Sequence, residues 1–293
     1  MKILFIGSVY LSEKILEKLL LINENIVGVI SKDNSKFNSD FKDISLLARK
    51  NKIAFHNTKN INSIKTITWI KNITPDIIFC FGWSELLKSE ILKIPNMGVL
   101  GYHPSLLPFN RGRHPLIWAK ILGLKKTGST FFFMDEGADT GDILSQKEFK
   151  ITFEDNANSI YNKMVKLASS QVLEFLPYLK NNSFKRKKQL KKENYWRKRV
   201  GSDGLIDFRM DSNSIINLVR ALSKPYIGAH CNFMGNEIKI WEIEKGKNNS
   251  VNIEPGKVIQ IINNQIEVKT GSTSVILTDH EFSNLPKINE YIL

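Results

Sequence analysis

The stretch DIIFCFG at residues 76–82 is an apolar run that begins with one aspartate and ends in glycine. Such a run is typical of a strand buried on both faces of a parallel sheet, because helices cover both faces of sheets of this kind. Two comparable runs precede it in the chain, KILFIG at residues 2–7 and IVGVIS at residues 26–31. The three runs together predict a core of parallel strands.

Helical segments alternate with these strands. Leu11, Ile15 and Leu19 recur at helical spacing after the first strand, and Ser12 is a candidate helix cap. The next predicted elements are a helix at 42–50, an extended segment at 53–57 and a helix at 61–72. This alternation predicts an α/β fold, with an open, mostly parallel, Rossmann-like sheet that carries helices on both faces.

In sheets of this class, ligands bind at the carboxyl ends of the strands. Those ends fall near Gly7, Ser31 and Gly82. The first strand runs into GSVYLSEK, which departs from the GxGxxG pattern of dinucleotide-binding proteins, and the sequence has no Walker phosphate loop. These two observations weigh against a dehydrogenase or an NTPase without excluding either class.

A long amphipathic helix is predicted at residues 155–178. Its apolar stripe, spaced for core packing, consists of Tyr161, Met164, Ala168, Val172 and Phe175. The basic stretch SFKRKKQLKKENYWRKR follows at residues 183–199. We predict a linker here, which is either a solvated connector or a segment that contacts an anionic substrate.

Beyond the linker, a helix at residues 213–223 precedes several short strands separated by turns. The predicted strands are HCNFMG, IKIWEI, KVIQII, QIEVKT and SVILT, and the turns are marked by Gly235-Asn236, Pro255-Gly256 and Asn263-Asn264. This pattern predicts a small, mainly β domain of OB-like type. The predicted division is therefore a first domain at 1–182, a basic linker at 183–202 and a C-terminal β domain at 203–293.

Composition and charge place few limits on function. The chain has 293 residues, enough for two unequal domains, and a net charge of +13 from widely spread basic residues. Cys80 and Cys231 each lie in an apolar run and are expected to be buried thiols. The sequence shows neither a leader-like segment nor an apolar run long enough to span a bilayer, so we expect no membrane contact and a cytoplasmic location.

Two polar clusters that follow apolar strands hold the candidate chemistry. They are GYHPSLLPFNRGRHP at 101–115 and MDEGADTGD at 134–142, and both are predicted to be loops. His103, beside a proline, is either structural or catalytic, and Asp139 is either a turn former or its partner. No metal site is expected, because His103 and His114 have no cysteine nearby and no helical HxxxH spacing. A hydrolase triad with Ser105 is conceivable, but no GxSxG elbow surrounds that serine.

The order of these motifs resembles a known enzyme family. HPSLLP, then RGR, then a helix with Trp118, then DEGADTGDIL, is similar to the catalytic core of the folate-dependent formyltransferases. That family includes methionyl-tRNA formyltransferases, nucleotide-sugar N-formyltransferases and a 10-formyltetrahydrofolate hydrolase domain. DGLIDF at 203–208, RALSKPYIGAH at 220–230 and IKIW at 238–241 resemble its C-terminal β domain, so the resemblance covers nearly the whole chain.

The resemblance implies a catalytic pair. The family pattern Asn-x-His, followed by a later Asp, maps onto Gly101, His103 and Asp139, so this chain lacks the asparagine. His103 would take a proton from the attacking amine, and Asp139 would hold the imidazole and stabilise its positive charge. In relatives the asparagine binds the oxyanion, so protonated His103, a backbone N–H or a water must replace it here. We expect Gly101→Asn to lower activity, because either the glycine backbone angle or the substrate excludes a side chain.

The resemblance also implies the ligands. The co-substrate would be 10-formyltetrahydrofolate, and no metal would take part. Its pterin is expected to lie against Glu85, Leu86 and Leu87 and against the loop residues Asp135, Glu136, Gly137 and Ala138. Arg113 matches a position that contacts the nucleotide-sugar in the sugar enzymes, or it is a surface arginine. Relatives often dimerise, so a homodimer is possible.

Three acceptors of the formyl group compete: a nucleotide-linked amino sugar or related amino sugar acid, the amine of methionyl-tRNA, and water. A non-enzymatic descendant of the family is a further alternative, motivated by Gly101. The tRNA enzymes carry a basic, glycine-containing insertion after the second strand. Residues 31–45 instead hold Asp33, Asp40 and Asp43 and no glycine, and we expect this loop to repel a phosphate backbone. This loop, the RGRHP run and DGLIDF favour the amino sugar.

Overall fold

The computed structural model describes residues 1–34, 39–190 and 192–293, and the chain divides into two compact units. The N-terminal unit comprises Met1–Gly112, Thr127–Phe149 and Asn162–Trp196. The C-terminal unit comprises Arg113–Lys126, Lys150–Tyr161 and Arg197–Leu293. Segments from the middle of the chain therefore contribute to each unit.

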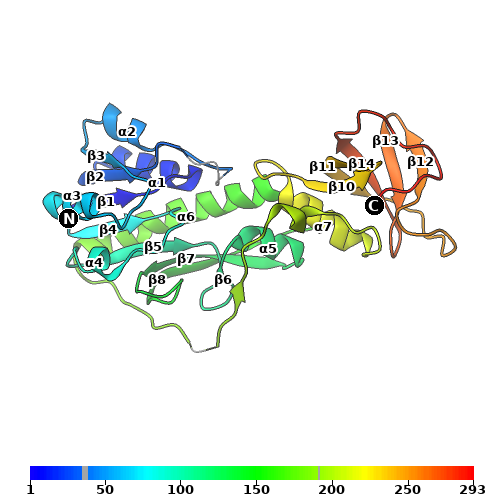
Figure 1. Ribbon diagram of the computed structural model, residues 1–293. Coiled ribbons are helices and arrows are strands. Elements are labelled where there is room, and N and C mark those ends of the chain that lie inside the picture. The colour runs from blue at the N-terminus through cyan, green and yellow to red at the C-terminus, as the bar shows by residue number, and fades with distance from the viewer. Residues whose placement is uncertain (35–38, 191) are drawn as a thin grey trace. The chain divides into compact units, whose positions relative to one another are not determined.

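The N-terminal unit is built on a seven-stranded sheet (Figure 1). In spatial order its strands are β3 (Phe55–Asn57), β2 (Ile26–Ser31), β1 (Ile3–Ile6), β4 (Ile77–Cys80), β5 (Val99–His103), β7 (Lys126–Phe133) and β8 (Ile143–Lys150). The first five run parallel, and β7 pairs antiparallel with β5. The predicted mostly parallel sheet is confirmed, and its strand order reverses between β1 and β4.

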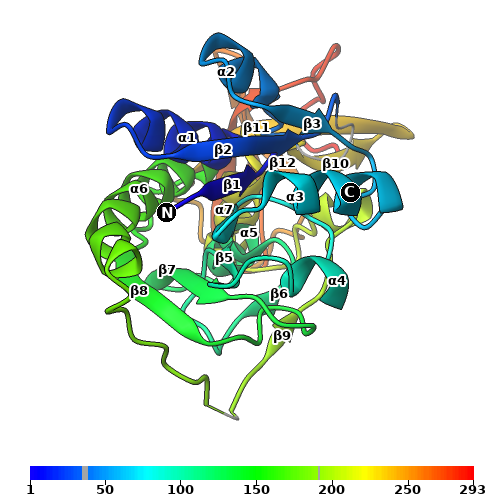
Figure 2. The ribbon, with the colours of Figure 1, turned by 90° about the vertical axis from the view of Figure 1, so that its left-hand side faces the viewer.

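Helices cover both faces of this sheet. Figure 2 shows α1 (Tyr10–Leu21) and α6 (Ala157–Lys180) on one face, and α3 (Ile64–Ile73) and α4 (Ser89–Leu92) on the other. The short α2 (Ser45–Lys50) precedes β3. Every residue of β1 and β4 is buried, as expected for strands between two helical layers.

Ser12 lies near the start of α1, as predicted. Helix α1 begins at Tyr10 after Val9, so Ser12 lies at its third residue. The Ser12 hydroxyl accepts a hydrogen bond from the Val9 amide at 3.3 Å and donates one to the carbonyl of Phe81 at 2.6 Å. It therefore caps the backbone at the start of α1 from the third helical position, and it also ties this start to the segment that follows β4.

Aromatic side chains pack together between β5, β7 and α6 in the N-terminal unit. Phe131 is fully buried, and its ring centroid lies 5.1 Å from Phe81, 4.8 Å from Tyr102 and 5.0 Å from Phe175. We expect Phe131→Ala to lower the free energy of unfolding of this unit by about 3–5 kcal/mol, through lost burial and the cavity left behind. Urea unfolding of the whole chain measures it, with the half-exposed Phe109→Ala as the matched control. Equal losses from the two variants would contradict this account of the core.

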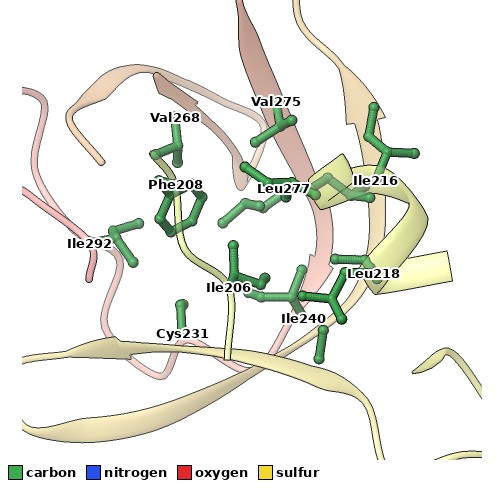
Figure 3. Packing of buried hydrophobic residues seen from close by; sticks show 14 of the residues in the cluster. Ile206, Phe208, Ile216, Leu218, Cys231, Ile240, Val268, Val275, Leu277 and Ile292 are labelled. Carbon is green, nitrogen blue, oxygen red and sulfur yellow. The ribbon is translucent and has the colours of Figure 1, made fainter. Parts of the chain in front are cut away.

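The C-terminal unit holds a five-stranded antiparallel sheet. Its strands in spatial order are β10 (Ala229–Phe233), β11 (Asn236–Lys245), β14 (Ser274–His280), β13 (Gln265–Lys269) and β12 (Val258–Ile262). Its helices are α5 (Pro115–Ile121), the short 3-10 turn Gly201–Gly204 and α7 (Ser212–Leu222). Figure 3 shows Ile206, Phe208, Ile240, Val268 and Leu277 packed together in its core. The predicted small β domain is confirmed.

Two further predictions concern burial and turns. Cys80 and Cys231 are free and buried, as predicted. Asn263 and Asn264 both have a positive φ, at 47° and 68°, which is typical of a tight hairpin turn between two strands. Within the described ranges, no helix combines the length and apolar character needed to cross a membrane.

Candidate functional site

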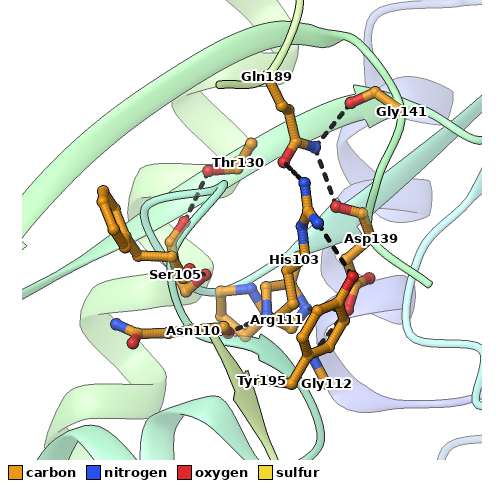
Figure 4. A network of polar contacts seen from close by, with 12 residues as sticks. His103, Ser105, Asn110, Arg111, Gly112, Thr130, Asp139, Gly141, Gln189 and Tyr195 are labelled. Atoms are coloured by element: carbon orange, nitrogen blue, oxygen red, sulfur yellow. Dashed lines mark hydrogen bonds and ion pairs between the residues drawn. The ribbon is translucent and has the colours of Figure 1, made fainter. Parts of the chain in front are cut away.

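His103 and Asp139 lie together in the N-terminal unit (Figure 4). His103 Nδ1 is 3.5 Å from Asp139 Oδ2, and the histidine is only 5% exposed. The prediction that both residues lie on loops is wrong for His103, which is the last residue of β5 and pairs with Thr130. Since β5 runs parallel to β4, His103 lies at the carboxyl edge of the parallel strands, where this fold class binds ligands.

Oxygen acceptors face both nitrogens of the His103 ring. Nε2 is 2.8 Å from the carbonyl oxygen of Asn110, and Nδ1 faces Asp139. Asp139 Oδ2 also accepts a hydrogen bond from the Gly112 amide at 3.0 Å. A neutral imidazole has a single N–H, so only the protonated ring can donate to both oxygens. Each ring nitrogen of His103 therefore has an oxygen atom within reach, and the tautomer decides which of them donates a hydrogen bond.

Gly101 lies two residues before His103, within the extended strand β5. A Cβ added here would come 2.8 Å from Met134 Cγ and 3.0 Å from Phe132 Cζ, which is too close for a normal contact. We expected a special backbone angle or the substrate to exclude a side chain. The special backbone angle is wrong, because Gly101 lies in ordinary strand, and the side chains of Met134 and Phe132 lie where a Cβ would go. The exclusion by substrate stays a prediction.

The residues proposed to meet the pterin lie in two groups. Glu85 accepts hydrogen bonds from Lys32 Nζ at 2.8 Å and from the Ile61 amide at 3.3 Å. Leu86 is largely exposed, whereas Leu87 is buried in the core and leaves only its backbone for a ligand. Each of these three residues follows β4.

The second group is the exposed turn of Asp135, Glu136, Gly137 and Ala138, which directly precedes Asp139. Asp135 Oδ1 accepts hydrogen bonds from the Gly137 amide and the Thr140 hydroxyl, so this carboxylate organises the turn. Arg113, the proposed substrate contact, belongs to the C-terminal unit.

The basic stretch after α6 adds residues that sequence reasoning missed. Arg111 is 3% exposed and donates to Gln189 Oε1 at 2.6 Å, to the Tyr195 hydroxyl at 2.9 Å and to Glu193. The two-residue strands β6 (Arg111–Gly112) and β9 (Tyr195–Trp196) pair in parallel. This part of the stretch is mostly exposed, as expected of a solvated connector, but it is also attached to the N-terminal unit by these contacts. The sequence offered one signal for these contacts: the lysine-rich run is interrupted by an acid, two amides and aromatic residues.

Across the described part of the chain, no group of three or more His, Cys, Asp or Glu side chains is placed to hold a metal ion. The groups found at the site are an imidazole, a carboxylate and a backbone amide. Such a set suits proton transfer coupled to attack on a carbonyl group.

Comparison with known proteins agrees with this chemistry. A methionyl-tRNA formyltransferase from Halothermothrix orenii is 33% identical over 98% of this chain and 94% of its own length. The bifunctional polymyxin resistance protein ArnA of Wigglesworthia glossinidia brevipalpis is 38% identical over 69% of this chain, and the match spans 31% of that longer protein. A solved N-formyltransferase from Helicobacter canadensis, in complex with folinic acid and dTDP-3-aminofucose, has 20% identity and a TM-score of 0.72, covering 94% of this chain and 98% of its own.

Family models match both halves of the sequence. The formyl transferase model matches residues 1–176, and the model of the formyl transferase C-terminal domain matches residues 200–289. The resemblance found in the sequence motifs is confirmed, and the chain belongs to the formyl transferase family.

Proposed function

We propose that this protein transfers the formyl group of 10-formyltetrahydrofolate to the primary amine of a nucleotide-linked amino sugar or a related amino sugar acid. The observation that carries the proposal is the His103–Asp139 pair at the carboxyl edge of the sheet, in a chain of the formyl transferase family. The Helicobacter canadensis enzyme, which binds folinic acid and a nucleotide-linked amino sugar, supports both the co-substrate and the acceptor.

His103 acts as the base in the proposed mechanism. The amine attacks the formyl carbon, a new C–N bond forms, and the carbonyl oxygen becomes an oxyanion. His103 takes the proton that the attacking nitrogen must lose, and Asp139 compensates the charge of the ring. Cleavage of the bond to N10 then releases tetrahydrofolate, whose N10 receives a proton.

The oxyanion needs a donor that residue 101 does not provide. Gly101 has no side chain, and the thioether of Met134, which fills the space beside it, has no N–H or O–H. We propose that His103 supplies this donor after it has taken the amine proton: Nδ1 faces Asp139, and the Nε2–H exchanges the Asn110 carbonyl for the oxyanion. In this scheme one imidazole serves both the amine and the oxygen.

Charge in the segment after β2 weighs on the choice of acceptor. Residues 31–45 carry three aspartates, but Lys32, Lys36 and Lys42 balance them, so the segment is formally neutral. A segment without net charge is expected neither to repel nor to attract a phosphate backbone, so the expected repulsion does not follow from its charge. Residues 35–38 of this loop lie outside the described residues.

Transfer to methionyl-tRNA is the second candidate. The Halothermothrix orenii enzyme matches nearly the whole chain, and several lysines and arginines of residues 183–199 are exposed. Many phosphates would then contribute to binding, which makes affinity steeply dependent on salt, by about one log unit per log unit of salt for each phosphate neutralised. A nucleotide-sugar has one or two phosphates and would show a shallow dependence.

The test is incubation with 10-formyltetrahydrofolate and a panel of nucleotide-linked amino sugars, followed by mass spectrometry of the products. We expect one panel member to gain a formyl group with the native protein and none with His103→Ala. In parallel, charged initiator tRNA is offered as acceptor, and its binding is measured by gel shift at two salt concentrations. Formyl-methionine formation with tight, salt-sensitive binding would overturn the sugar proposal. Release of formate with neither acceptor modified would favour hydrolysis by water.

A further inference from the structure

A segment of the basic stretch contacts both the loop that follows His103 and the loop that carries Asp139. We call residues 187–190 and 192–196 the strap. At its start, Lys187 pairs antiparallel with Ile143 through backbone hydrogen bonds of 2.8 and 2.9 Å. Near its end, the Asn194 side chain accepts from the Asn110 amide at 2.9 Å and donates to the Asn110 side chain at 3.1 Å. Asn110 is the residue whose carbonyl faces His103 Nε2.

Gln189 is the strap residue that contacts the loop of Asp139 (Figure 4). Its Nε2 donates to the carbonyl oxygen of Asp139 at 2.9 Å and to that of Gly141 at 2.7 Å. Its Oε1 accepts from Arg111 Nη2 at 2.6 Å. Because guanidinium nitrogens can only donate, the Arg111 contact fixes which end of the Gln189 amide faces the two carbonyls.

The loop that Gln189 holds is strained. Asp139 has φ = 60°, a left-handed conformation that is unfavourable for a non-glycine residue and persists where its surroundings enforce it. Two residues later, a Cβ on Gly141 would come within 1.7 Å of the Phe133 carbonyl oxygen, so the backbone here is tightly wound. The two hydrogen bonds from Gln189 therefore hold the backbone carbonyl of the strained residue and that of the residue two positions later.

Movement of this loop would move the carboxylate. Asp139 Oδ2 lies 3.5 Å from His103 Nδ1, at the limit of a useful ion pair, so a small shift separates the two groups. In enzymes a misplacement of about 1 Å can cost about 10²-fold in rate. The side chain of Gln189 is thus coupled to the reacting groups through the backbone of Asp139.

We infer that Gln189 is a positioning residue for the His103–Asp139 pair: from the strap, its amide holds the strained backbone at residues 139–141, and Arg111 orients that amide. The inference rests on the proposed function for its kinetic readout. It adds to the reaction a residue that lies 50 positions from Asp139 in the chain.

Gln189→Glu separates positioning from simple anchoring of the strap. The glutamate keeps the length of the side chain and forms an ion pair with Arg111, so the strap stays attached. It has no N–H to donate, and its second oxygen would face the two carbonyls. We expect kcat to fall by about 10²-fold in both Gln189→Glu and Gln189→Ala, with an unchanged KM for the folate. The thermal midpoint of Gln189→Glu should fall no further than that of Gln189→Ala, because only the glutamate keeps the contact with Arg111.

The matched control is Gln146→Ala. Gln146 Nε2 also makes two hydrogen bonds, to the Leu107 carbonyl at 2.8 Å and to the Thr130 hydroxyl at 3.0 Å, without touching Asp139. Its kcat should stay near the wild-type value. Wild-type kcat in Gln189→Glu, or an equal fall in Gln146→Ala, would overturn the inference.

An NMR measurement keeps the inference testable if formyl transfer itself is not found. The ring resonances of His103, assigned through His103→Ala, should shift in both Gln189 variants in the same direction as in Asp139→Asn. They should stay in place in Gln146→Ala. His103 signals that do not move in the Gln189 variants would overturn the positioning role, whatever acceptor the enzyme uses.

Discussion

Formyl transfer should fall by about 10²- to 10⁴-fold when His103 is replaced by alanine or Asp139 by asparagine. Alanine removes the only group proposed to take the amine proton. Asparagine keeps the size of Asp139 but removes the charge 3.5 Å from the ring, and its amide end would present N–H groups to Nδ1. Turnover under saturating co-substrate and acceptor measures both effects.

Stability serves as the control for these two variants. His103 is buried, so its alanine variant is expected to unfold at a slightly lower temperature. Asp139 is partly exposed, and Asp139→Asn should keep the wild-type midpoint. Asp142→Asn, in the same loop, is the matched charge change and should retain turnover. Near-normal turnover in His103→Ala would show that the catalytic assignment is wrong.

The second large effect concerns the missing asparagine. We expect Gly101→Asn alone to lower both activity and stability, the latter by about 1–3 kcal/mol, because Met134 and Phe132 already fill the space beside the strand. Removing Met134 at the same time provides room for the amide. Gly101→Asn in a Met134→Ala background should therefore raise kcat relative to Met134→Ala alone, by up to about 10²-fold if the amide becomes an oxyanion donor.

The comparison of the four proteins decides between two explanations. A gain in the double variant means that the site uses another donor in place of the asparagine and accepts the amide once there is space. No gain over Met134→Ala would mean that residue 101 does not face the developing oxyanion in this enzyme. A Gly101→Asn variant more active than the native chain would show that Met134 yields at little cost.

The buried strands of the N-terminal sheet could be predicted because each corresponds to one continuous apolar run of the sequence. β1, β2 and β4 each lie inside the predicted apolar runs, and β2 begins and ends at the predicted residues 26 and 31. The end of β5 could not be placed in this way. Gly101 and His103 are turn-like in composition, and the strand extends to His103 because it pairs with Phe131 and Thr130 of β7.

The candidate site was predicted only in part, for a similar reason. His103 and Asp139 stand in dense polar clusters and could be singled out, although their pairing came from the resemblance. The role of Gln189 was not predicted, because its partner Arg111 is 78 residues away and the only signal was an amide within a lysine-rich run. The contact between Met134 and Gly101 could not be predicted either, because the loop that begins at Met134 has no periodic pattern.

The strap bears on where this enzyme can be divided. In fusion proteins, a catalytic module is commonly thought of as ending with its last regular helix, which here is Lys180 at the end of α6. A module excised at that point would leave Arg111 without its partners Gln189, Glu193 and Tyr195. The backbone carbonyl of Asp139 would also lose its hydrogen bond from Gln189. A segment exchanged by recombination or by protein engineering therefore has to extend through Trp196 to keep these contacts.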